Sequence, residues 1–141
     1  MAQVIIFTNE NGNVSVCVPT GELTIEEVLA KDCPAGAIIV DSASLPEADN
    51  DFFNAWELKD DAVTVNLAKA KDMQTANLNA QAKLEVAHRQ TNAGIGIDNK
   101  LNDADWLALL TAARAAINAA TSTKDLRDAV APVNAAIAAN V

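Results

Sequence analysis

Residues that commonly carry out catalysis are few in this 141-residue chain, and His88 is its only histidine. General acid–base and nucleophilic catalysis usually pair a His, Cys or Ser with an orienting carboxylate. His88 lies among Glu85, Arg89 and Gln90 on a predicted long helix, and a lone histidine is a weak catalytic signal. We therefore interpret it as a solvated or packed helix residue, and the sequence predicts no catalytic site and no enzymatic activity.

The two cysteines, Cys17 and Cys33, are predicted to be free thiols. They are able in principle to pair, but no export signal precedes them and the reducing cytosol disfavours disulfides. Cys17 falls on a predicted strand, facing opposite to Val16 and Val18, and no neighbour in sequence activates its thiol.

Two short motifs suggest metal or cofactor binding, and both fail on their spacing. Asp49-Asn50-Asp51 begins like a calcium loop, but Phe53 holds the fifth position and Asn54 the sixth, where an EF-hand needs glycine. Gly94-Ile95-Gly96 lacks the third glycine of a dinucleotide loop and follows a helix instead of a strand. We interpret the first as a solvated acidic loop and the second as a linker, and expect no cofactor and no metal.

Charge divides the chain into two regions. Residues 1–61 contain twelve acids and two bases, a net charge of −10, whereas residues 62–141 contain seven acids and eight bases, a net charge of +1. The total of −9 repels nucleic-acid backbones and anionic lipid surfaces, so we expect no nucleic-acid and no membrane partner. The longest apolar run near the N-terminus, residues 4–7, is far too short for a signal peptide or a spanning helix.

The first region is predicted to form a small antiparallel sheet with one short helix. Residues 4–7 and 14–18 read as strands joined by a tight Asn11-Gly12 hairpin, in which both residues tolerate positive φ. Thr24 and Glu27 form a capping box at the start of the helix. A strand over residues 37–40, a surface loop over 41–54 and a second hairpin around Asp60-Asp61 complete an acidic β-rich domain, residues 1–66.

The second region, residues 67–141, is predicted to be helical. Residues 67–91 are predicted to form one long helix with a thin apolar stripe, which gives it little apolar surface to bury by itself. We therefore expect this helix to pack against another protein or against a second copy of the chain. Two further helices carry apolar residues at steps of three and four, which predicts an antiparallel helical hairpin. The predicted fold class is therefore α+β, a small antiparallel sheet and short helix followed by a long helix and a C-terminal helical hairpin.

Aromatic residues gather directly after the acidic loop. Three of the chain's five aromatic residues lie here, namely Phe52, Phe53 and Trp56. Such clusters either fill the hydrophobic core or contact a binding partner. The candidate partner-binding residues are these three and two leucines of the long helix, Leu78 and Leu84.

The first region also resembles a group of small tailed-bacteriophage proteins that are often encoded beside tail-fibre genes. The likeness covers residues 3–72 and rests on residues 4–7, 12–16, Pro19, 23–27, 31–36, 39–41, 45–46 and 53–56. The order of a small sheet before helices is similar to that of tail-fibre assembly chaperones. This resemblance implies a non-enzymatic assembly chaperone that binds a tail-fibre or other tail protein in the host cytoplasm. The alternative is a permanent virion component, in which the long helix forms homo-oligomers or docks on the tail.

Overall fold

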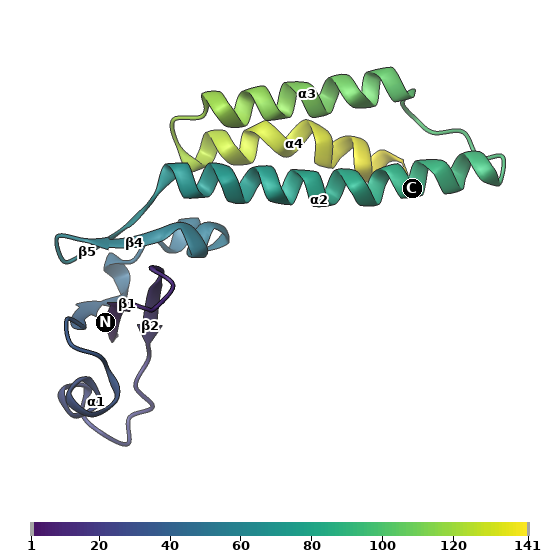
Figure 1. Cartoon of the computed structure of the whole chain (residues 1–141). Coiled ribbons are helices and arrows are strands. Elements are labelled where there is room, and N and C mark those ends of the chain that lie inside the picture. Colours follow the sequence, from purple (N-terminus) through teal and green to yellow (C-terminus); the bar gives the residue numbers. More distant parts are fainter. Residues whose placement is uncertain (1, 141) are drawn as a thin grey trace. The chain divides into compact units, whose positions relative to one another are not determined.

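The computed structural model of the chain describes residues 2–140 and confirms the α+β fold class (Figure 1). The chain divides into two compact units, Met1–Asn66 and Leu67–Val141. The first holds all the described strands and the short helix, and the second holds three long helices. Each unit is described by itself below.

The first unit contains a three-stranded antiparallel sheet in the order β2-β1-β3. The central strand β1 (Gln3–Thr8) pairs with β2 (Val14–Cys17) on one side and β3 (Ile38–Asp41) on the other. Val4 and Ile6 belong to the main core of this unit, which they form with Val14 and Trp56. Ile5 points to the opposite face of the sheet. Helix α1 (Ile25–Asp32) packs against strands β1 and β3. Burial on both faces explains why β1 reads as a continuous apolar run instead of an alternating one.

The turn between β1 and β2 is longer than the tight Asn11-Gly12 hairpin that the sequence predicts. It occupies residues 9–13, and of its residues only Gly12 has a positive φ, 79°. The side chain of Asn9 organises this turn, because its Oδ1 accepts hydrogen bonds from the backbone N–H groups of Asn11 and Asn13. A side chain therefore supplies the turn contacts that a two-residue loop would obtain from its own backbone.

Helix α1 begins as its sequence predicts. The Thr24 hydroxyl accepts a hydrogen bond from the Glu27 N–H at 3.2 Å, and the Glu27 carboxylate accepts one from the Thr24 N–H at 2.8 Å. This reciprocal pair is the capping box. The helix ends at Asp32, with Cys33 extended directly before Pro34.

The acidic segment is not the surface loop that its polarity suggested. It forms two stretches of 3-10 helix, η1 (Ser42–Ser44) and η2 (Glu47–Ala55). The strands β4 (Trp56–Lys59) and β5 (Ala62–Val65) then form the second predicted hairpin, with positive φ at Asp60 and Asp61. This hairpin is a separate two-stranded sheet, so the antiparallel strands form two sheets where one was expected.

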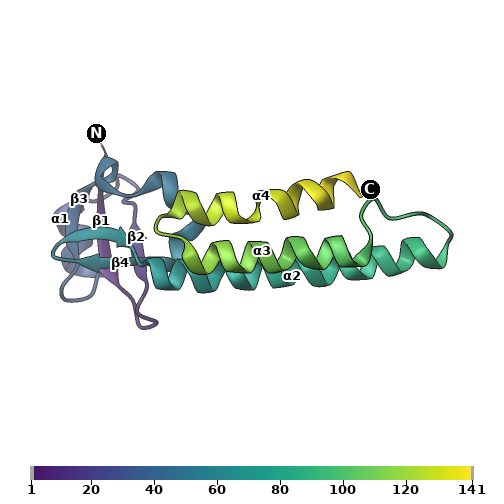
Figure 2. The same ribbon diagram turned by 90° about the horizontal axis from the view of Figure 1, so that it is seen from above.

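The second unit is a bundle of three helices, α2 (Leu67–Gly94), α3 (Asp103–Ala119) and α4 (Thr123–Ala139). Figures 1 and 2 show the three helices side by side, and each packs against both of the others. The long helix therefore finds its neighbours within its own chain. This corrects the expectation that its buried face needs another protein or a second copy.

The predicted helical hairpin is present, and polar side chains mark where its helices start. Asn102 caps α3 and Ser122 caps α4, each accepting a hydrogen bond from a backbone N–H three residues on. Beside the second cap, hydrogen bonds from the Thr121 N–H and hydroxyl lower the pKa of the Asp125 carboxyl. The buried seam of α3 and α4 consists of apolar residues at helical spacing, namely Trp106, Leu110, Ala113, Ile117, Leu126, Ala129 and Val133.

Candidate functional site

Three of the five candidate partner-binding residues lie in the interior. Phe52 and Trp56 are buried in the first unit, where Trp56 belongs to the main core and its indole N–H donates to the Asp49 carbonyl. Leu78 is fully buried in the helical bundle. A buried side chain cannot contact a partner without opening the core, so these three are corrected to core residues.

The other two candidates differ from each other. Phe53 is half-buried and packs on Trp56, with ring centroids 4.8 Å apart. Leu84 is 75% exposed on α2, beside a shallow hollow lined by Gln81, Leu84, Glu85, His88, Asn134, Ile137 and Ala138. Leu84 thus remains a candidate contact on the α2–α4 side of the bundle.

His88 and the two cysteines belong to different units of the chain. That histidine lies in the α2–α4 hollow, whereas both cysteines are free and belong to the first unit. Partial burial raises the pKa of the Cys33 thiol, and the hydrogen-bonded Cys17 thiol raises it further. Over residues 2–140, no three His, Cys, Asp or Glu side chains are grouped so as to hold a metal ion.

A buried polar network occupies the end of the helical bundle at which α2 ends and α3 begins. Glu85 of α2 accepts a 2.7 Å hydrogen bond from the side-chain amide of Asn140, next to the end of α4. The amide oxygen of Asn140 accepts from the Lys100 N–H, and that of Asn99 accepts from both Asn140 and Asn92. The network therefore ties α2, the loop before α3 and the end of α4 together.

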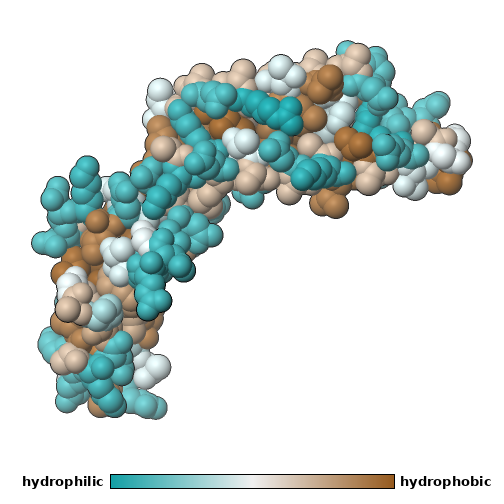
Figure 3. Space-filling view, in the orientation of Figure 1, coloured by the Kyte–Doolittle hydropathy of each residue, from teal (hydrophilic) through white to brown (hydrophobic). Residues whose placement is uncertain are grey.

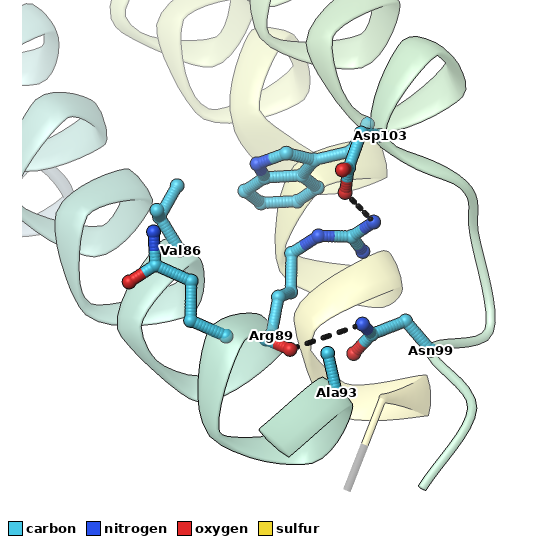
Figure 4. A pocket seen from close by; sticks show the side chains of 7 residues that line it. Val86, Arg89, Ala93, Asn99 and Asp103 are labelled. Carbon is cyan, nitrogen blue, oxygen red and sulfur yellow. Dashed lines mark hydrogen bonds and ion pairs between the residues drawn. The ribbon is translucent and has the colours of Figure 1, made fainter. Parts of the chain in front are cut away.

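Arg89 extends this network to the start of α3. Its guanidinium donates to the Leu101 carbonyl and to the Asp103 carboxylate, both at 2.7 Å, and lies 5.8 Å from the centre of the Trp106 ring. Figure 4 shows Arg89 reaching from α2 toward Asp103, with the Asn99 amide donating to the Arg89 backbone carbonyl. Because Arg89 is buried, these partners and the aromatic face offset much of the cost of removing its charge from water.

A groove runs between α2 and α3 and begins at this network. One hollow of about 270 Å³ is lined by Val86, Arg89, Gln90, Ala93, Asn99, Asp103 and Trp106. A second of about 490 Å³ is lined by Asn79, Ala82, Lys83, Val86, Leu110 and Arg114. Val86 lines both, so the two hollows are neighbours along the seam between α2 and α3. Together we call them the α2–α3 groove and define it by these lining residues.

The groove has an apolar floor and exposed apolar side chains. Val86 is 41% exposed, and Leu107, which is 58% exposed, follows Asp103 by four residues and precedes Leu110 by three on α3. In Figure 3, hydrophobic residues lie between hydrophilic ones over the helical unit. Such a surface suits protein binding, because its apolar centre loses water when it is covered and its polar edges fix orientation.

The sequence contained one signal for this site that periodicity analysis missed. The inward row of α2 is formed by Ala70, Gln74, Leu78, Ala82, Glu85, Arg89 and Asn92, at steps of three and four. Polar residues occupy four of these seven positions, so a search for apolar stripes finds only a thin face. The Gln, Glu, Arg and Asn residues share the spacing of the apolar ones, and treating all seven as one buried row would have predicted the helical bundle.

Comparisons of the chain with protein-family models, with curated proteins and with solved structures found no match. Across residues 2–140, the helices are too short or too polar to cross a membrane.

Proposed function

We propose that this protein is a non-enzymatic assembly chaperone that binds a tail-fibre or other tail protein of a bacteriophage in the host cytoplasm. The observation that carries a protein-binding role is the distribution of exposed apolar side chains. Among the described residues, five of the seven large exposed hydrophobic residues belong to the helical unit: Leu84, Val86, Ile95, Ile97 and Leu107.

Isolated surface leucines are ordinary, but one of these residues lines a concave surface, and a second lies one helical turn from residues that line it. Val86 lines the α2–α3 groove, and Leu107 is adjacent to its lining residues on α3. The specific link to a phage tail rests on the resemblance of residues 3–72 to proteins encoded beside tail-fibre genes.

Co-expression with a bacteriophage tail-fibre protein tests the proposal. As a chaperone, the protein should raise the soluble yield of the fibre and should be absent from purified virions or far below one copy per fibre. An unchanged yield, with the protein present in virions at fixed stoichiometry, would favour the alternative of a permanent virion component.

The same assay tests the non-enzymatic part of the proposal. A triple variant, His88→Gln with Cys17→Ser and Cys33→Ser, should fold and support the same fibre yield as the parent. None of the three residues lines the α2–α3 groove. Loss of the yield in a folded triple variant would instead indicate a chemical role for one of these groups.

A further inference from the structure

We infer that the α2–α3 groove binds an amphipathic helix of the partner that carries Asp or Glu beside its apolar stripe. This inference rests on the proposed protein-binding function and specifies the chemistry of the segment that is bound. Its three supports are the length of the groove, the nature of its floor and the charge of its rim.

The dimensions of the groove suit a short helix. Its α3 wall extends from Asp103 to Arg114, which at 1.5 Å per residue is about 17 Å, or about three helical turns. Two packed helices form the walls, so a third helix laid along them would bury its apolar residues at positions i, i+3, i+4 and i+7. The helical unit would then resemble a four-helix bundle whose fourth member comes from the partner.

The floor offers apolar contacts along this length. Ala82, Val86 and Leu110 line the wider hollow, and Trp106 lines the narrower one. The small side chain of Ala82 allows close approach of a partner helix, whereas Val86 and the adjacent Leu107 supply exposed apolar area. Covering the exposed area of Val86 and Leu107 removes it from water, which is the favourable term for association.

Charge on the rim selects the partner. Of the residues that line the wider hollow, the charged ones are Lys83 and Arg114, and both are exposed. Asp105 of α3 is also exposed but lines neither hollow. Glu85 and Arg89 of α2 are buried in the polar network, and His88 lies on the α2–α4 side. Arg114 donates a 3.2 Å hydrogen bond to the Asn79 side chain across the groove, which holds its guanidinium at the rim.

At the narrower hollow Asp103 forms an ion pair with Arg89, and Glu85 of the network lies on the α2–α4 side. Lys83 and Arg114 are therefore two positive groups on opposite walls, in a chain whose net charge is −9. A helix with acidic residues flanking its apolar stripe complements this rim, whereas a basic helix is repelled by it.

The first experiment titrates the full-length protein with synthetic amphipathic peptides of about 15 residues, long enough to cover the groove. One peptide has Glu beside a Leu stripe, and its matched control has Lys at the same positions. Amide NMR shifts should change in residues 79–93 and 103–114 with the Glu peptide only. Equal binding of the Lys peptide, shifts confined to other residues, or no binding of the Glu peptide would each overturn the inference.

Matched variants locate the contact. Val86→Asp puts an acid on the groove floor, and Val18→Asp makes the same substitution at an exposed valine of the first unit; both side chains are exposed, so both variants should fold. Val86→Asp, and separately the pair Lys83→Glu with Arg114→Glu, should weaken binding of the Glu peptide about tenfold or more. Val18→Asp, and the charge-matched pair Lys31→Glu with Lys59→Glu in the first unit, should leave the affinity for the Glu peptide unchanged. If the control variants weakened binding and the groove variants did not, the groove assignment would be wrong.

Fibre co-expression separates this inference from the proposed function. If the parent raises the soluble yield and the Lys83→Glu with Arg114→Glu variant does so equally, the groove assignment is wrong and the chaperone role stands. If the parent gives no gain but binds the Glu peptide in the groove, the chaperone role is wrong and the groove assignment stands.

Discussion

The first unit fills its interior with β-branched and aromatic side chains from its strands, centred on Val4, Ile6, Val14 and Trp56. The helical unit fills much of its interior with alanine and with a hydrogen-bonded polar network around Glu85 and Arg89. An apolar core is stabilised by area removed from water and tolerates modest reshaping, whereas a buried polar network depends on every partner being present. The two units should therefore respond differently to the loss of a single side chain.

The largest expected effect is a charge placed in the apolar seam of the bundle. Ile117 is fully buried on α3, so Ile117→Asp would bury a carboxylate without a partner and should cost about 4 kcal/mol of unfolding free energy. Thermal unfolding, followed by NMR signals of each unit, measures this cost. A melting temperature within a degree or two of the parent would show that Ile117 does not face the seam.

An intermediate effect is expected from one member of the polar network. Asn140→Ala removes the donor to Glu85 and the acceptor for the Lys100 N–H, leaving buried polar groups unpaired. The expected cost is about 2–3 kcal/mol, from chemical denaturation. Asn134→Ala, at an exposed asparagine within α4, is the control and should change stability little. Equal costs for the two variants would mean that the hydrogen bonds of Asn140 contribute nothing to stability.

These two regions also differ in how far their sequences predict them. Capping at Thr24 and the hairpin at Asp60-Asp61 followed from local patterns, because the contacts that fix them lie within a few residues. The helical hairpin followed from the apolar periodicity of its two helices. The packing of α2 against α3 and α4 did not follow from local patterns. Gln74 donates a hydrogen bond to the carbonyl of Leu126 and Glu85 accepts one from Asn140, and each partner is more than fifty residues away in the sequence. Long-range polar pairing leaves no periodic apolar signal.

The candidate site was predicted less well than the fold, for a related reason. Phe52 and Trp56 were predicted as partner contacts, and their burial makes them core residues instead. The α2–α3 groove could not be predicted, because its lining residues come from two helices whose packing against each other left only a thin apolar stripe on α2.

The smallest expected effect tests a purely local feature of the first unit. Thr24→Ala removes the hydroxyl that accepts the Glu27 N–H and leaves the start of α1 without its side-chain cap. The contact is exposed and short in sequence range, so the cost should be about 1 kcal/mol, well below that of Asn140→Ala. Thr24→Ser keeps the hydroxyl and should retain most of the stability. The measurement is the denaturant concentration at the unfolding midpoint, compared between variants whose unfolding free energies have the same dependence on denaturant. A loss in the serine variant equal to that in the alanine variant would assign the effect to the missing methyl group, and α1 would then depend on packing at its first turn instead of on the capping box.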